Sequence, residues 1–402
     1  MSVDLPIIIA GSGPAGSVLA LYLAQRNIPV ILLEREQAIP IDLRASTFHP
    51  PSLEMIAGLG DGVLEEMLAK GLQVSRYQYR DRRTNQVAEF DMAQIADETR
   101  YPFRLQLEQY ELTLIIEQKL KKYSCAEQRF GHELIGFEEG EDFIEAIVNT
   151  ADGEQRIRGS FLVGAEGARS NARKQAGIDY SGFTYDEKFL VASTDFPFEE
   201  VFDDLAYVNY VSDPEEWCVI LRTDKKWRVL WPTEPNVADD VYLSDAYLQE
   251  RLHHLYDKEG DYDIAHRTLY AVNQRVAECY FKGRMVLVGD ACHINNPLGG
   301  MGMNGGLHDA FNLAEKLVAV VDQAADYTEA FRHYDRQRRE LAVKFVQEHT
   351  INNKKLMEST DTDVQNQRQK MLMETAADPV RAKAFLMERA MINCVRDSLA
   401  VE

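Results

Sequence analysis

Two short apolar runs separated by an amphipathic stretch open the chain. Residues 7–9 (Ile-Ile-Ile) have the continuous apolar character of a strand buried on both faces, and residues 17–26 place apolar side chains at helical spacing. A second apolar run, residues 30–33, ends at Glu34. This order predicts a strand–helix–strand unit of the kind that starts a doubly wound sheet.

Aromatic and polar residues alternate in two later parts of the chain, residues 75–90 and residues 180–275. In the second part, clear runs lie at 207–210, 217–221 and 227–231. A period of two is typical of a sheet with one face against an interior. We therefore expect a mostly antiparallel sheet that has one face on a pocket.

Apolar runs of the parallel-strand type return at 161–164 and 285–288, and helical spacing predicts helices over 108–123 and 305–321. The C-terminal part is mostly helical and charged, with a break at Asp378-Pro379. The predicted fold class is α/β, with a Rossmann-like nucleotide-binding domain interleaved with a mostly antiparallel β-sheet substrate domain, plus C-terminal helices. The predicted ranges are 1–74, 101–178 and 278–326 for the discontinuous nucleotide-binding domain, 75–100 and 179–277 for the substrate domain, and 327–402 for the helical region.

Composition permits a sizeable core. The chain has 402 residues, of which 45% are hydrophobic and 27% charged, which is ordinary for a globular protein. A net charge of −21 opposes binding to nucleic acid phosphates and to anionic lipid surfaces. No apolar stretch approaches the ~20 residues of a spanning helix. We expect no nucleic acid and no membrane partner.

The five cysteines are scattered and show no CxxC or CxxH spacing. That pattern is typical of a reduced protein without structural zinc. The N-terminus lacks the basic and apolar regions of a secretory signal. We expect a cytoplasmic protein with no metal site.

Residues 11–16, Gly-Ser-Gly-Pro-Ala-Gly, form a G-x-G-x-x-G fingerprint. Gly11 allows a tight turn, Gly13 lets the backbone approach a pyrophosphate, and Gly16 lets the helix pack closely on the strand. Glu34 is placed to accept hydrogen bonds from ribose hydroxyls and would repel a 2′-phosphate. These features predict a site for FAD or NAD rather than NADP.

Three further strand-end or helix-start turns accompany the fingerprint. Residues 300–305 repeat the glycine spacing before a predicted helix, where a bend can hold a negative group such as the N1/C2 carbonyl edge of a reduced flavin. Gly289-Asp290 closes a buried strand, where a carboxylate can accept from ribityl-type hydroxyls, and residues 164–170 close another. Each also occurs as an ordinary turn.

In combination, residues 11–16, Glu34, Arg44, residues 164–170 and residues 289–302 resemble the class A (para-hydroxybenzoate hydroxylase-like) FAD-dependent aromatic monooxygenases. The order and spacing match over residues 5–339. The resemblance implies that the nucleotide-binding domain binds FAD, and that NAD(P)H visits as a transient co-substrate. The middle motif departs from the family pattern, because Glu166 stands where the family usually has Asp.

The resemblance also implies the cofactor-binding residues. Gln109 matches a polar residue that the family places against FAD, with Gln106 as a rival, and Arg44 matches an arginine near the diphosphate and the pyridine nucleotide. The whole predicted set is Gly11, Gly13, Pro14, Ala15, Gly16, Glu34, Arg35, Arg44, Gln109, Glu166, Gly289, Asp290, Pro297, Gly300, Gly302, Met303 and Asn304.

The implied reaction uses NAD(P)H to reduce FAD, and O2 then forms a flavin C4a-hydroperoxide that hydroxylates a small aromatic substrate, phenolic or heteroaromatic. In this picture residues 297–303, beginning with the catalytic candidate Pro297, line the oxygen side of the flavin ring.

A phenol reacts better as a phenolate, so a base or a proton relay is expected. His49, Tyr207 and Tyr210 are candidates for it by position, and Arg222 is a candidate for anchoring a carboxylate. Each of these residues also has an ordinary explanation as a packing or surface residue.

Four further residues carry weaker expectations. Trp217, Trp231 and Met301 are expected to form apolar walls, and His293 is expected to make a structural hydrogen bond.

Several alternatives stay open at this level. A flavoprotein epoxidase or Baeyer–Villiger enzyme, a saturase-type reductase and a non-catalytic flavin-binding sensor are compatible with the same motifs. A halogenase is disfavoured, because residues 227–232 do not match the Trp-x-Trp-x-Ile-Pro pattern. The helical tail fits either a lid on a monomer or the contact surface of a homodimer.

Overall fold

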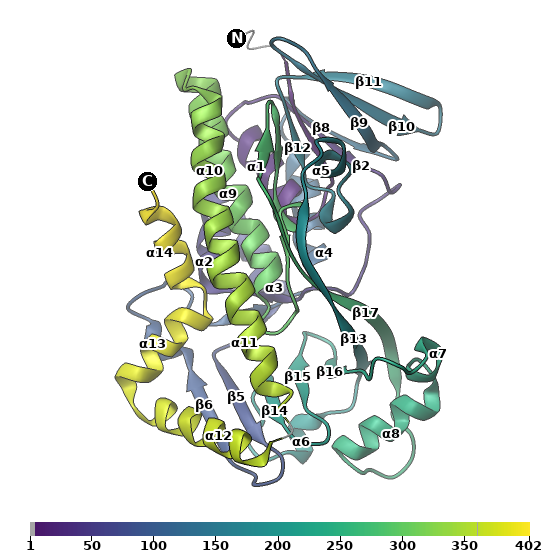
Figure 1. The fold of residues 1–402 in the computed structure, drawn as a ribbon, viewed down its shortest axis with the longest axis vertical. Coiled ribbons are helices and arrows are strands. Elements are labelled where there is room, and N and C mark those ends of the chain that lie inside the picture. The colour runs from purple at the N-terminus through teal and green to yellow at the C-terminus, as the bar shows by residue number, and fades with distance from the viewer. Residues whose placement is uncertain (1–4, 360) are drawn as a thin grey trace.

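The computed structural model describes residues 5–359 and 361–402. Figure 1 shows a parallel sheet in the upper half of the molecule and a larger sheet in the lower half, with the C-terminal helices along one side. No helix within these two ranges combines the length and the apolar character needed to cross a membrane.

β1 lies inside a six-stranded sheet and pairs in parallel with β12 on one side and β2 on the other. All its residues are buried, as expected for a strand covered on both faces. The predicted strand–helix–strand unit is confirmed. The spatial order is β18 (Phe281–Lys282), β19 (Met285–Leu287), β12 (Phe161–Gly164), β1 (Ile7–Ala10), β2 (Val30–Glu34) and β8 (Ala126–Phe130).

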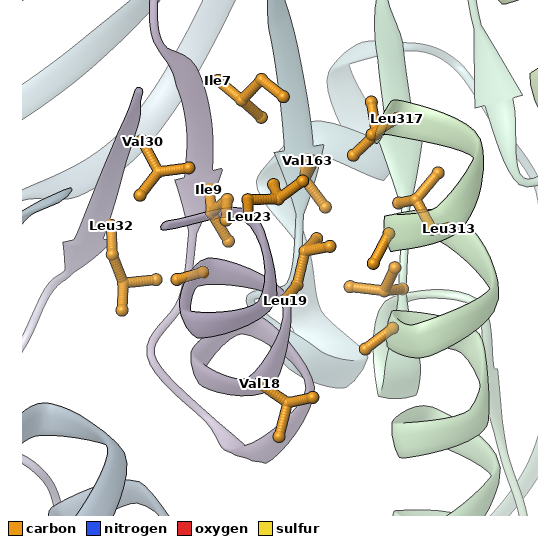
Figure 2. Close-up of a cluster of buried hydrophobic side chains, with 14 of the residues drawn as sticks. Ile7, Ile9, Val18, Leu19, Leu23, Val30, Leu32, Val163, Leu313 and Leu317 are labelled. Atoms are coloured by element: carbon orange, nitrogen blue, oxygen red, sulfur yellow. The ribbon is translucent and has the colours of Figure 1, made fainter. Parts of the chain in front are cut away.

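Helices α1 (Pro14–Ala24) and α9 (Met301–Gln323) pack against each other beside this sheet. Figure 2 shows Ile9 of β1 close to Leu19 and Leu23 of α1, with Leu313 of α9 on the far side of α1. These side chains belong to one buried cluster, and each fully buried side chain of this size contributes about 1.5–3 kcal/mol. This core fixes the position of the turns at the strand ends.

The longest strands, β13 (Tyr180–Thr194) and β17 (Ile264–Ala277), pair antiparallel from Tyr180 opposite Ala277 to Thr194 opposite Ile264. In Figure 1 this pair runs from the upper half into the lower half. Neighbours in their eight-stranded sheet are antiparallel except β14 and β5, which confirms the mostly antiparallel prediction. The order is β20 (His293–Ile294), β17, β13, β16 (Trp227–Pro232), β15 (Cys218–Arg222), β14 (Val208–Ser212), β5 (Arg76–Asp81) and β6 (Val87–Asp91).

Two three-stranded sheets complete the strand inventory of the described ranges. One consists of β9 (Glu133–Glu139), β10 (Ile144–Thr150) and β11 (Gly153–Gly159); the other consists of β3 (Thr47–Phe48), β7 (Arg104–Gln106) and β4 (Leu72–Val74). β7 leads almost directly into α4 (Gln109–Leu120), the helix predicted over 108–123.

The C-terminal helices cover β5 and β6. α10 packs on α9, and α12 packs on β5 and β6. The break between α12 and α13 lies at Asp378-Pro379, as predicted. The Asp378 carboxylate accepts from Val380 N and Arg381 N and so caps α13. The remaining helices are α2 (Pro50–Leu59), α3 (Val63–Lys70), α5 (Asn171–Gln175), α6 (Phe198–Val201), α7 (Asp239–Tyr242), α8 (Asp245–Leu255), α10 (Tyr327–Leu341), α11 (Glu348–Met357), α12 (Thr362–Ala377), α13 (Pro379–Arg389) and α14 (Ile392–Ala400).

α9 begins earlier than the sequence predicts, at Met301 rather than at residue 305. The glycines in its first turns lower helix propensity, but packing requires them. A Cβ on Gly305 would lie 3.0 Å from His293 Cε1, and a Cβ on Gly306 would lie 3.0 Å from Gly289 Cα. Gly300, with a left-handed φ of 68°, is the N-cap, and the helix begins at the next residue.

Candidate functional site

A cavity of about 1410 Å³ extends between the carboxyl ends of the parallel strands and the face of the large sheet. Its lining comes from the first glycine loop, from the bend before α9, and from β13 to β17. Ligands of open α/β sheets bind at this edge because the loops that follow the strands meet there.

The first glycine loop presents the N-terminus of α1 to the cavity. Gly13 is the N-cap, Pro14 follows it, and no side chain caps the helix. A Cβ on Gly16 would lie 2.0 Å from Gly11 O, whereas a Cβ on Gly13 would meet no atom within 4 Å. Gly16 therefore serves helix packing, and the backbone at Gly13 borders open space in which an anion can reach the helix N-terminus.

Two carboxylates flank that loop. Glu34 Oε2 accepts from Ser12 N (3.1 Å) and Ser12 Oγ (2.8 Å), and its Oε1 accepts from Glu36 N (3.0 Å). Asp290 reaches the cavity, and no donor to its carboxylate occurs among the residues described. Its side chain is exposed to the open cavity, and the surrounding protein raises its pKa by desolvation.

Arg35 and Arg44 also line the cavity. Their exposed side chains pair with Glu36 (3.1 Å) and Asp42 (2.9 Å), respectively. The two guanidinium groups thus lie at its mouth.

Glu166 lines the cavity, but its carboxylate is directed at the start of α5. It accepts from Ser170 Oγ (2.7 Å) and Ala172 N (2.9 Å). Burial raises its pKa. In this arrangement the longer side chain caps a helix at the turn.

The bend before α9 is held from behind by side chains that do not line the cavity. Asn304 Nδ2 donates to Thr47 O (2.8 Å) and to Gly300 O (2.7 Å), and its Oδ1 accepts from His49 N (2.8 Å). His49 Nε2 lies 2.8 Å from Gly299 O. Burial, with a contribution from Arg104, lowers the pKa of His49 to about 3. His49 is therefore a neutral brace of the bend rather than a group in the cavity.

The two rival glutamines occupy different places. Gln109, the first residue of α4, lines the cavity. Gln106 lies outside the lining, is fully buried, and accepts from Thr47 Oγ1 at 3.0 Å.

The remaining predicted cofactor residues also divide into those that line the cavity and those that lie behind its lining. Gly11, Ala15, Gly289, Pro297, Gly300, Gly302 and Met303 line the cavity together with those already placed there, and Gly16 and Asn304 support it from outside.

Among the predicted substrate residues, Tyr210 lines the cavity. Tyr207 precedes β14, is 37% exposed and lies edge-on to Trp227. Arg222 Nε is 3.8 Å from Glu199. The structure thus brings neither Tyr207 nor Arg222 into the cavity, because at the ends of their strands these side chains lie over Trp227 instead.

Of the three residues expected to form apolar walls, one lines the cavity. Met301 lines the cavity, whereas Trp217 and Trp231 lie in the apolar clusters beside the sheet. His293 Nε2 lies 2.8 Å from Asp309 Oδ2, which is the structural hydrogen bond that the sequence predicts.

The lining also contains polar residues that were not predicted from the sequence, among them Arg104, Arg228 and Tyr270. Arg104 and Arg228 are 3% and 5% exposed. Arg228 donates to Glu108 at 2.7 Å and also borders a second cavity of about 410 Å³. For Arg228 the available signal was a charged residue inside the apolar run at 227–231, since arginine is rarely buried without a partner.

Alternate positions of the large sheet form the remaining wall. The side chains that face the cavity are spaced by two residues, as the pleat requires. They are Val208 and Tyr210 of β14, Val219 and Leu221 of β15, Arg228 and Leu230 of β16, and Thr268, Tyr270 and Val272 of β17.

Comparison with known proteins gives concordant matches. A family model described as an FAD binding domain matches residues 4–349. Para-nitrophenol 4-monooxygenase of Pseudomonas sp. (strain WBC-3) is 28% identical over 396 residues, which cover 96% of each chain. 6-Hydroxy-3-succinoylpyridine 3-monooxygenase HspB of Pseudomonas putida (strain DSM 28022 / S16) is 28% identical, covering 80% of this chain and 81% of its own.

Among solved structures, p-nitrophenol 4-monooxygenase PnpA from Pseudomonas putida DLL-E4 superposes with a TM-score of 0.91 at 26% identity. The match covers 98% of this chain and 99% of that one.

Proposed function

We propose roles for the residues of the cavity from the premise that this chain belongs to the family of FAD-dependent aromatic hydroxylases. The protein is an NAD(P)H-dependent flavoprotein monooxygenase that uses O2 to hydroxylate a small aromatic substrate. The observation that carries the assignment of roles is a single cavity with a nucleotide-type loop at one end and an apolar sheet face at the other.

The residues present fit FAD. The N-terminus of α1 has no side-chain cap, the space beside Gly13 is open, and no protein donor reaches the Asp290 carboxylate within the described ranges. An anionic, polyhydroxylated ligand would find partners in these open groups. When bound, this cofactor would supply the redox chemistry, with NAD(P)H as hydride donor and O2 as the oxidant.

We assign the adenosine end to the first glycine loop. Glu34 lies at the end of β2, where it would accept from ribose hydroxyls, while Gly11 and Gly13 would bring the backbone close to the diphosphate. Asp290 would accept from the hydroxyls of the ribityl chain. Arg44, Gln109 and Glu166 complete this half as lining residues.

We assign the flavin ring to the bend before α9. Gly299 and Gly300 adopt φ values of 95° and 68°, and α9 has no side-chain cap. Backbone N–H groups and the positive end of the helix dipole stabilise negative charge there. His49 and Asn304 keep the bend in place, and Pro297, Met301 and Met303 exclude water around it.

The substrate of this protein is, in our proposal, a monocyclic phenol. The para-nitrophenol 4-monooxygenases match nearly the whole chain, and the apolar side chains of β14–β16 suit an aromatic ring. Tyr210 is the predicted base or relay residue that faces this space.

Two further expectations belong to the proposal. A cytoplasmic location is supported by the free state of all five cysteines. A monomer or a homodimer is expected, and light scattering of the purified protein distinguishes the two.

The decisive experiment is an absorbance spectrum of the purified protein, followed by O2 uptake with NADH or NADPH and a panel of phenols. We expect flavin bands and oxygen uptake that a nitrophenol stimulates, with formation of a hydroxylated product. Bound flavin without stimulation by any phenol would contradict the proposed substrate class, and absence of flavin binding would contradict the proposed cofactor site.

A further inference from the structure

Arg104 is a buried cation that has no carboxylate partner. It is the first residue of β7, it lines the cavity, and it is 3% exposed. None of the acidic residues described lies within 4.0 Å of its guanidinium, and Nε has no hydrogen-bond partner among them or any other described group. Arg228, the other buried arginine of the lining, forms an ion pair with Glu108 at 2.7 Å.

The groups that face Arg104 are neutral or aromatic. The guanidinium lies 4.1 Å from the centre of the Tyr77 ring and near the Tyr210 hydroxyl. The titratable and charged groups around it, taken from every neighbouring element, are Tyr77 and Tyr79 of β5, Tyr210 of β14 and His49, with Arg368 of α12 and Arg389 of α13 beyond Tyr79. None of these side chains carries a compensating negative charge near neutral pH.

An isolated buried charge is costly, several kcal/mol after relaxation. The ring of Tyr77 and the Tyr210 hydroxyl offset only part of that cost. The free protein therefore keeps an unpaired cation at the side of the cavity where the apolar wall of β14–β16 begins. A ligand anion that pairs with this cation would remove the free-energy cost of its burial.

We propose that Arg104 binds the phenolate oxygen of the substrate, so that the protein selects the ionised form of a phenol. The inference rests on the function proposed above and adds the charge state of the substrate. On binding, the phenol O–H bond breaks, its proton is released to solvent buffer, and the oxygen lone pairs accept N–H groups of Arg104. The Tyr77 ring, 4.1 Å from the guanidinium, orients it, and Tyr210 lines the cavity beside it.

A phenolate carries more electron density on its ring than the phenol, which favours attack on an electrophilic oxygen. Arg104 thus acts as the residue that sets both the position and the ionisation of the substrate. Arg222, which the sequence suggested as an anionic-group anchor, pairs with Glu199 outside the cavity and serves as the matched control.

The test uses 4-nitrophenol, whose neutral and ionised forms differ in visible absorption, and its methyl ether, which has the same ring but cannot ionise. Both are titrated into the oxidised FAD-loaded protein without NAD(P)H. We expect the bound nitrophenol to show the phenolate spectrum at pH values where the free compound is mainly protonated. Its Kd should fall as pH rises toward the pKa of the phenol.

The variants are Arg104→Met, Arg104→Lys and Arg222→Met. Arg104→Met should raise the Kd of nitrophenol about 10- to 100-fold and abolish the phenolate spectrum of the complex, because a charge-assisted hydrogen bond is lost. The Kd of the methyl ether should change less than about 2-fold on the same argument. Arg104→Lys should retain part of the affinity for nitrophenol, and Arg222→Met should bind it with the Kd of the unsubstituted protein.

Binding of nitrophenol in its neutral form, or an equal loss of affinity for both ligands in Arg104→Met, would overturn the inference, as would the same loss in Arg222→Met. If Arg104→Met does not fold, the spectrum and the pH dependence of the unsubstituted protein decide. Failure to retain flavin refutes the proposed function instead, and the flavin bands report this separately.

Discussion

The carboxylates of Glu34 and Asp290, at the nucleotide end of the cavity, differ in the number of hydrogen bonds that they accept from the protein. Glu34 already accepts three hydrogen bonds from the protein, whereas Asp290 has none from the residues described. Loss of Asp290 should therefore cost the cofactor a partner without leaving a protein donor unpaired.

We expect Asp290→Ala to raise the Kd for FAD about 10-fold, because one or two hydrogen bonds to a charged group are lost. Fluorescence titration of the flavin-free protein measures this. Asp322→Asn, on an exposed residue at the far end of α9, is the control. Unchanged affinity in Asp290→Ala would remove this residue from the site.

Two buried histidines make stability sensitive to acid. Burial lowers the pKa of both His49 and His308 to about 3. Their unfolded-state pKa is near 6.5, so between about pH 6.5 and 3 the unfolded chain binds more protons and stability falls as pH falls. Each histidine contributes at most about 1.4 kcal/mol per pH unit in this window.

We expect His49→Gln to reduce the slope of unfolding free energy against pH between about pH 6 and 4 by up to that amount. Urea unfolding at a series of pH values measures the slope. His333→Gln, on a partly exposed histidine that hydrogen bonds Val401 O, provides the comparison. Equal slopes for His49→Gln and the unsubstituted protein would contradict the neutral-brace assignment.

At the scale of elements, the first glycine loop separates folding from binding. A Cβ at position 16 collides with Gly11 O at 2.0 Å, but one at position 13 meets no atom. The two glycines therefore serve different purposes within one motif.

We expect Gly16→Val to lower the yield of folded protein by disrupting the packing of α1 on β1, typically by several kcal/mol. Gly13→Val should fold with a similar melting temperature yet retain no flavin, since its side chain fills the space beside the diphosphate. Circular dichroism and the flavin absorbance of the purified variants separate the two effects. A fully flavinated Gly13→Val would refute the pyrophosphate assignment.

Local patterns were sufficient to predict the parallel elements. A strand buried on both faces gives a continuous apolar run, so β1, β2 and β12 were predictable from hydrophobicity alone. The start of α9 was not, because the close approach of Gly306 to Gly289 joins segments that propensity treats separately.

The substrate half of the site could not be predicted in the same way. Tyr210 belongs to β14, which pairs with β5, more than a hundred residues away in sequence, and Arg104 belongs to β7 in a different sheet. The two residues therefore line one cavity through long-range packing. Periodicity predicts which side chains share a face, but not which strands are neighbours. Arg222 was misplaced for a different reason: Val219 and Leu221 of its strand face the cavity, so Arg222 lies on the opposite side, over Trp227.

At the scale of the whole molecule, the C-terminal helices support the pocket from its outer side. Phe385 of α13 stacks on Phe90 with ring centroids 4.4 Å apart and meets Tyr79 edge-on at 6.1 Å. Tyr79 in turn stacks on Tyr210 at 4.9 Å. A chain of rings thus links the tail to a side chain in the cavity.

We expect Phe385→Ala to destabilise the protein by about 2–3 kcal/mol, since it removes a partly buried ring from an aromatic cluster. It should also raise the KM for the phenol while flavin content stays unchanged. Thermal unfolding, flavin absorbance and steady-state kinetics test this. Val380→Ala, on an exposed residue of the same helix, is the control, and an unchanged KM would show that the rings act on stability alone.

The continuous pair β13–β17 has a consequence for how this protein can diversify. Because one pair of strands reaches from the nucleotide end to the substrate end, the spacing of the two ends does not depend on loops. The cavity-facing codons of β14, β15 and β16 can then drift, or be randomised in a gene library, without shifting the cofactor. New ring substituents become accessible by single substitutions in three short strands, while the machinery that handles oxygen is inherited intact.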